Sequence, residues 1–156
     1  MKSFQQFLNE ASEDKSTSLK SLANLLRVFM PFVKKELKMK SVPDIHIVHD
    51  SKGTFDIKNV PAITFVDNEK FSKDVKTFGR TSSKNRIVVQ VQDRHPIDVL
   101  RTLAHELTHY HQHTTGKYGT GETGSDTENQ ANVEAGIIMR NFDHAHPEFF
   151  KLKPFK

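Results

Sequence analysis

The sequence predicts an α+β fold in which one long helix precedes a group of strands and two further helices follow. Apolar residues recur at the helical period in three segments, 19–39, 97–109 and 128–139. Short runs of apolar and β-branched residues lie between the first two of these segments, at 45–49, 62–66 and 86–92. With 156 residues, the chain is expected to form one domain over 19–156, preceded by an N-terminal extension.

The composition is that expected of a soluble protein. Charged residues make up 27% of the chain, the mean hydropathy is −0.59, and no apolar run approaches the roughly 18 residues of a membrane span. The N-terminus lacks a basic region followed by an apolar core, so we expect no secretory signal, no membrane partner and, by default, a cytoplasmic location. Cysteine is absent, which leaves histidine and carboxylate as the strong metal ligands.

The chain is basic, with a net charge of +4 and a pI near 9.3. Basic residues crowd the N-terminal third, and three lysines lie within the last six residues. Such residues are typical of the solvated face of a helix, and neither an aromatic platform nor a nucleic-acid-binding motif accompanies them. We therefore expect no specific nucleic-acid partner.

The first helix and the first strand each carry one informative feature. Pro31 lies inside the helical pattern of 19–39, and we expect it to kink the helix or to divide it in two. In the strand at 45–49, His46 and His49 fall on opposite faces, so these two histidines cannot share a metal ion.

The second half of the strand region predicts a hairpin. A short strand at 75–80 and the strand at 86–92 are joined by a polar turn, and one of the two is expected to lie at a sheet edge. Within 86–92, the odd-numbered apolar residues face one side and the two glutamines face the other. The glutamine side is expected to be the wetter face.

The most specific motif of the chain is the run His105-Glu106-Leu107-Thr108-His109. It lies in a helix that Pro96 is expected to begin. Residues four apart on a helix share a face, so His105 and His109 can aim two imidazoles at one ion. Glu106 is rotated by about 100° from His105, beside the open side of that ion, where it can deprotonate a bound water. The motif predicts a hydrolytic zinc site.

The other histidines of this helix do not complete the site. His113 lies eight residues from His105, about 12 Å along the axis, which is too far for one ion to bind both. His111 points to another face. Gln112 and Thr115 stand where a metzincin would carry glycine and histidine, which excludes that class.

A third ligand is expected from the last predicted helix, because a catalytic zinc site uses three protein ligands and water. Ala131 and Ala135 form a small-residue stripe on the side of Glu128, which allows close packing on the metal helix. Asp126 is the alternative ligand, or a partner for a histidine N–H. A structural role for Glu128 at the positive helix N-terminus remains the other interpretation.

These motifs resemble the gluzincin branch of the zincin metallopeptidases, and most closely minimal members such as the ImmA/IrrE-like small domains. The resemblance covers about residues 75–140 and depends on the histidine–glutamate motif and on Glu128-x-x-Ala131-Asn132-x-x-Ala135. It implies an N-terminal helix, a small mixed sheet of three to four strands, an active-site helix and a third-ligand helix. It also implies one zinc ion held by His105, His109 and Glu128, with Glu106 as the general base.

The resemblance is incomplete at the group that would stabilise the oxyanion. No tyrosine or histidine donor is placed by a motif, which leaves Tyr118, Arg140, His144 and His146 as candidates. The family also implies an edge strand that holds a peptide substrate by strand addition, and residues 75–80 are the candidate for it.

The N-terminus carries a second resemblance. Phe4, Phe7 and Leu8 give residues 1–10 an apolar helical face, and a polar linker is expected over 11–18. This opening resembles the capsid-targeting peptides of internal proteins of large contractile-tailed bacteriophages, which a prohead protease cuts after a Leu/Ile-x-Glu triplet. Leu8-Asn9-Glu10 before Ala11 matches that triplet, which implies cleavage there, with the protease and scaffold as partners. The other interpretation is a helix that packs on the domain.

Taken together, the residues and both resemblances predict a zinc-dependent endopeptidase that acts on a protein or peptide substrate. The leader implies packaging in a phage capsid and delivery to the host cytoplasm. The alternatives are a zincin-like protein that acts by binding a host factor, and a virion structural protein that contains zinc.

Overall fold

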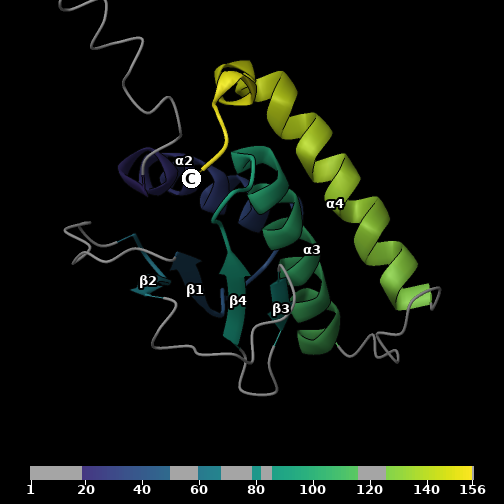
Figure 1. Ribbon diagram of the computed structural model, residues 1–156. Helices are drawn as coiled ribbons and strands as arrows, with labels where there is room; N and C mark the ends of the chain where they lie inside the picture. The colour runs from purple at the N-terminus through teal and green to yellow at the C-terminus, as the bar shows by residue number, and fades with distance from the viewer. Residues whose placement is uncertain (1–18, 50–59, 68–78, 82–85, 116–125, 156) are drawn as a thin grey trace, which may run out of the picture.

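The computed structural model describes residues 19–49, 60–67, 79–81, 86–115 and 126–155 (Figure 1). The expectations for the leader, for the linker, for cleavage between Glu10 and Ala11, and for Tyr118 lie outside these residues. The elements are α2 (Leu19–Glu36), β1 (Asp44–His49), β2 (Ile63–Asp67), β3 (Gly79–Thr81), β4 (Arg86–Gln90), α3 (Pro96–Thr114), α4 (Asp126–Ala145) and the 3-10 helix η2 (Pro147–Lys151). The predicted α+β class and the order of its elements are confirmed.

Helix α2 is continuous through Pro31, so of the two expected effects of this proline, a kink or a division into two helices, the division is wrong. Its buried face supplies Leu22, Leu26, Phe29 and Val33 at helical spacing, all fully buried. Proline has no backbone N–H, so the helix lacks one hydrogen bond at Pro31. Burial of the apolar stripe stabilises the helix and offsets this loss.

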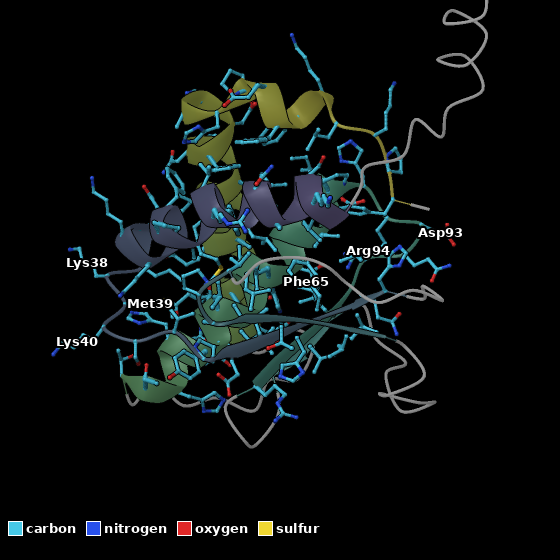
Figure 2. All side chains as sticks on the ribbon, turned by 90° about the vertical axis from the view of Figure 1, so that its left-hand side faces the viewer. Lys38, Met39, Lys40, Phe65, Asp93 and Arg94 are labelled. Atoms are coloured by element: carbon cyan, nitrogen blue, oxygen red, sulfur yellow. The ribbon has the colours of Figure 1, made fainter. Side chains whose placement is uncertain are left out.

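Helix α2 ends three residues before the predicted end at Met39. Lys38 adopts a left-handed backbone with φ of 53°, and the N–H of Met39 donates to the carbonyl of Lys34 at 2.9 Å. The N–H of Lys38 donates to the carbonyl of Lys35 at 3.2 Å, which completes a Schellman motif. Lys38 and Lys40 point outward at this turn, whereas Met39 is buried (Figure 2).

The four described strands form one mixed sheet in the order β2-β1-β4-β3. Strands β2, β1 and β4 are parallel, and β3 pairs antiparallel with β4 at the edge. This confirms the predicted hairpin and its edge strand, although β3 covers only 79–81 and residues 75–78 lie outside the described part.

The two faces of the sheet differ in burial, as the sequence indicates. Ile45 lies between Ile63 and Ile87 in register, and these three side chains enter the core. On the opposite face Val88 is only 2% exposed, although Arg86 and Gln90 beside it are half-buried. The glutamine face is therefore the wetter of the two, as expected, although Val88 makes it dry at the centre of β4.

The helices pack around the sheet in layers. Helix α3 contacts β3 and β4 on one side and α4 on the other, and α2 contacts both α3 and α4. Helix α4 lies beyond α3 as seen from the sheet (Figure 1). Among the described helices, none has the length and apolar character needed to cross a bilayer.

A cluster around Arg94 joins the sheet, α3 and the end of the chain. Its guanidinium donates to the carbonyl of Gln90 at 2.7 Å and to the hydroxyl of Thr102 at 2.6 Å. Its own carbonyl accepts from the N–H of Phe155 at 2.8 Å, and the Phe155 ring is buried. The cluster fixes the start of α3 relative to β4, and thereby the position of the metal motif.

Candidate metal centre

Helix α3 presents the histidine motif from a well-defined start. His95 is the N-cap, and its Nδ1 accepts from the N–H of Ile97 at 3.1 Å, with Pro96 at the first helical position. The apolar face of the helix is formed by Leu100, Leu103, Ala104 and Leu107, which are all fully buried. Since that face is fixed on the core, the neighbouring face directs the two motif histidines toward α4.

Three side chains converge on one point between α3 and α4. Nε2 of His109 lies 2.8 Å from one carboxylate oxygen of Glu128, and Nε2 of His105 lies 3.1 Å from the other. The two Nε2 atoms are 3.1 Å apart, and the rings meet edge to face at 83°. His105, His109 and Glu128 therefore form a group that can hold a metal ion.

The spacing of these atoms matches a small, tetrahedral ion. Bonds of 2.0–2.2 Å at tetrahedral angles place neighbouring ligand atoms about 3.3–3.6 Å apart. The observed separations of 3.1 Å are about 0.2–0.5 Å shorter than this, and the separation of 2.8 Å is about 0.5–0.8 Å shorter. Coordination by this set therefore requires the three side chains to move apart by less than about 1 Å.

The cluster is partly open to solvent. The side chains of His105, His109 and Glu128 are 19%, 15% and 21% exposed. Glu106, one residue after the first ligand, is 9% exposed and is one of three buried polar residues in the described part of the chain. A carboxylate on the turn that carries both imidazoles can exchange a proton with a water molecule bound near the cluster.

Helix α4 places Glu128 in its first turn. Ala131 and Ala135 are 0% and 2% exposed, and their small side chains allow the close α3–α4 contact that the sequence predicts. Asp126, the alternative ligand, is exposed and does not belong to the cluster. The structure thus brings together the two histidines and Glu128.

Gln112 is a contributor to this centre that sequence reasoning missed. Its side chain is buried between α3 and α4, and its Oε1 lies 2.9 Å from Nδ1 of His109. Its Nε2 donates to the carbonyl of Thr127 at 3.0 Å and to Oε1 of Gln130 at 3.2 Å. The available signal was its position three residues after His109, on the same side of the helix. The side chain that lies beside the second ring nitrogen of His109 is therefore Gln112, whereas Asp126 was the candidate for this place.

The structure does not bring the other described oxyanion candidates to the centre. Arg140 and His144 are exposed on α4, about 18 and 24 Å along the axis from Glu128. His146 packs its ring against Phe142 and Phe149 at the far end of the same helix. These residues belong to the core and surface of the helix end.

Comparison with known proteins provides no family for this chain. No family model, no curated protein and no solved structure matches it. The functional assignment consequently depends on the chemistry of the site.

Proposed function

We propose that the chain is a zinc-dependent endopeptidase of the gluzincin type, with His105, His109 and Glu128 as the zinc ligands. The convergence of these three side chains from two helices is the observation that carries the proposal. Two imidazoles and one carboxylate, without a thiolate, form the ligand set of hydrolytic zinc sites. Three protein ligands leave a fourth position for water or substrate, which favours a catalytic over a structural ion.

The chain's own residues then supply the remaining steps of hydrolysis. A zinc ion bound here contributes Lewis acidity, which activates water and polarises a carbonyl group. Glu106 accepts a proton as the water oxygen bonds to the peptide carbonyl carbon. It then delivers that proton to the leaving nitrogen as the C–N bond breaks. The buried position of Glu106 shields this carboxylate from bulk water.

The position of the edge strand β3 favours a peptide as the substrate. It lies antiparallel at the end of the sheet, and α3 packs against it. An extended peptide can add to such an edge through main-chain hydrogen bonds, beside the helix that carries the metal ligands. The substrate class is therefore an extended segment of a protein.

The N-terminal triplet suggests where the enzyme acts. Leu8-Asn9-Glu10 before Ala11 supports a leader that directs the chain into a phage capsid, is removed there, and allows delivery to the host. Co-expression with a prohead protease tests this, and mass spectrometry should find a mature chain that begins at Ala11. An intact N-terminus under those conditions argues against the leader.

Hydrolysis itself is tested on the purified chain. Zinc added to chelator-treated protein should restore cleavage of an unfolded protein substrate, and the Glu106→Gln variant should not respond. Cleavage by Glu106→Gln at the rate of the unaltered chain would reject the proposed mechanism.

A further inference from the structure

We infer that a cavity beside α2 binds a small amphipathic anion, of the class represented by a medium-chain fatty carboxylate. The cavity has a volume of about 590 Å³, within the range of roughly 300–1,000 Å³ that is typical of small-molecule sites. The described residues that line it belong to α2, to the chain before β1 and to the turn 60–62 before β2. The metal cluster belongs to α3 and α4, so this second site lies on other elements of the fold.

Most residues that line the cavity are apolar. Of the nine described lining residues, seven are apolar, and these include Met30 and Pro31 on α2 and Val42 before β1. Met30 and Val60 are only 8% and 3% exposed and belong to the core, whereas Pro31 is exposed. The cavity therefore extends from the surface to the core, and an alkyl chain placed in it leaves water, which is favourable.

The two polar residues that line the cavity are both cations. Arg27 and Lys34 are seven residues apart on α2, which places them on one face of the helix about 10.5 Å apart along its axis. Both are exposed, and Arg27 donates to Oδ1 of Asn24 at 2.7 Å, which orients its guanidinium. No acidic residue is among the described residues that line the cavity. Positive charge at the solvent side of an apolar cavity favours a ligand whose apolar body ends in an anionic group.

Hydrogen bonds hold the turn that forms another wall of the cavity. The N–H of Ile63 donates to the carbonyl of Val60 at 3.0 Å, and the carbonyl of Ala62 accepts from the N–H of Ile45 at 2.8 Å. Pro61 has a restricted φ, and Ala62 adopts a left-handed backbone with φ of 66°. A left-handed alanine is uncommon and persists only where surrounding contacts hold it, as they do at ligand sites. This wall is therefore formed before a ligand arrives, which lowers the ordering cost of binding.

The size of the site favours a small ligand over a folded partner. A stable protein interface uses about 20–30 residues on each side, whereas nine described residues line this cavity. Octanoate carries one carboxylate at the end of an unbranched alkyl chain and is the probe of choice. 1-Octanol has the same chain length without the charge and is its matched control.

Binding is measured on the full chain at about 0.15 M salt, where charges farther than about 8 Å away are largely screened. With octanoate below its micelle concentration, carbon-13 methyl NMR should show saturable shifts at Met30 and Ala62, and calorimetric titration should give one octanoate per chain. 1-Octanol should bind at the same methyl groups about 3- to 10-fold more weakly, because it lacks the ion pair with the cations of α2.

A first pair of variants places a charge in the cavity. Pro31→Glu introduces a carboxylate four residues after Arg27 and three residues before Lys34, where it pairs with both cations and repels the probe. Octanoate should then bind about 10-fold more weakly. Pro31→Ala makes the same backbone change without a charge and should bind octanoate within a few fold of the unaltered chain. Both variants restore an N–H to α2, so the helix is retained.

A second pair of variants removes the cations. Arg27→Gln together with Lys34→Gln should weaken octanoate binding by about 3- to 10-fold and leave 1-octanol binding unchanged. Lys35→Gln together with Lys40→Gln removes the same charge from exposed residues outside the lining, and should bind octanoate as the unaltered chain does.

The inference is overturned if octanoate does not saturate at one per chain, if 1-octanol binds as tightly, or if Pro31→Glu and Pro31→Ala bind octanoate equally. Two further results would assign the cavity to another occupant and also reject the inference. One is displacement of octanoate by a synthetic peptide of residues 1–10 that binds more tightly. The other is a shift of the same methyl groups with protein concentration alone, which would indicate a second copy of the chain. None of these readouts uses zinc or peptidase activity, so failure of the proposed function leaves this test unaffected.

Discussion

The carboxylate of Glu128 lies 2.8 Å from Nε2 of His109, although nineteen residues of sequence separate the two. This contact joins the first turn of α4 to the middle of α3, and the buried Ala131 below it keeps the two helices close. A metal ion bound by this carboxylate and the two imidazoles, whose Nε2 atoms lie 3.1 Å apart, would hold the three side chains together. Metal binding and the packing of α4 on α3 are therefore expected to depend on each other.

Removal of any one ligand should abolish stoichiometric zinc binding. In His105→Ala, His109→Ala and Glu128→Ala we expect the zinc affinity to fall by more than about 100-fold. Loss of a residue that only hydrogen-bonds to a metal ligand typically lowers metal affinity by about 10- to 100-fold, and loss of a ligand itself should cost more. Elemental analysis after dialysis and a competition titration with a chromophoric chelator measure this.

The matched controls for the ligand variants are Asp126→Asn and His113→Ala. Both residues are exposed. Asp126 lies two positions before Glu128, and His113 lies on α3, the helix that carries His105 and His109. These variants should bind zinc as the unaltered chain does. Loss of zinc in Asp126→Asn, with binding retained in Glu128→Ala, would assign the third ligand to Asp126.

Glu106→Gln should separate metal binding from catalysis. The amide cannot accept the proton of the attacking water, so kcat is expected to fall by about 10²- to 10⁴-fold while zinc affinity stays within a few fold. Initial rates on a fluorogenic peptide, with metal content determined on the same sample, give both values. A parallel loss of zinc and rate would instead make Glu106 part of the coordination. Glu134→Gln on α4 serves as the control for charge removal.

Zinc should stabilise the fold without being required for it. The metal site adds to an apolar core that spans α2, α3, α4 and the sheet. At a free zinc concentration 100 times the Kd, the free energy of unfolding should rise by about 2.7 kcal/mol, measured by urea titration with and without chelator. Complete unfolding of the chelated chain would indicate a structural ion instead.

Phe142 is expected to be a large contributor to stability. It is fully buried, and its ring lies 5.0 Å from that of Phe29 and 5.9 Å from that of Phe149. Phe142→Ala should lower the free energy of unfolding by about 3–5 kcal/mol. Val133→Ala, on the same helix but 60% exposed, should change it by less than about 0.5 kcal/mol. Equal effects of the two would contradict the placement of α4.

His46 should make stability depend on pH. Burial, and then the charge of Arg86, lower the pKa of His46, while Asp44 opposes the shift. The unfolded chain therefore binds the proton first, so His46 costs stability as the pH falls below about 6.5 and costs none above it. Urea titrations at one pH above about 6.5 and at one pH below it measure this loss. Between these two pH values, the free energy of unfolding should fall less in His46→Gln than in the unaltered chain. Identical losses would exclude this role.

The predictable part of the fold came from local patterns. Helix α3 begins at Pro96 as expected because its start signals and apolar stripe agree, and the β3–β4 hairpin follows from one polar turn. Glu128 was predictable because the alanine stripe identifies the face that packs on α3.

The remaining features depend on contacts distant in sequence. Gln112 meets Thr127 only after α4 has docked, and Arg94 meets Phe155 only after the chain end has folded back. The continuity of α2 at Pro31 depends on burial of the whole helix face rather than on the local effect of proline.

X-ray absorption spectroscopy of the zinc-loaded full chain tests the proposed metal centre most directly. We expect one zinc per chain with two imidazole nitrogens at about 2.0–2.1 Å and one or two further oxygens, and we expect the imidazole signal to be lost in His105→Ala together with His109→Ala. A spectrum with no imidazole contribution, or one unchanged by this double substitution, would contradict a zinc site built from His105, His109 and Glu128.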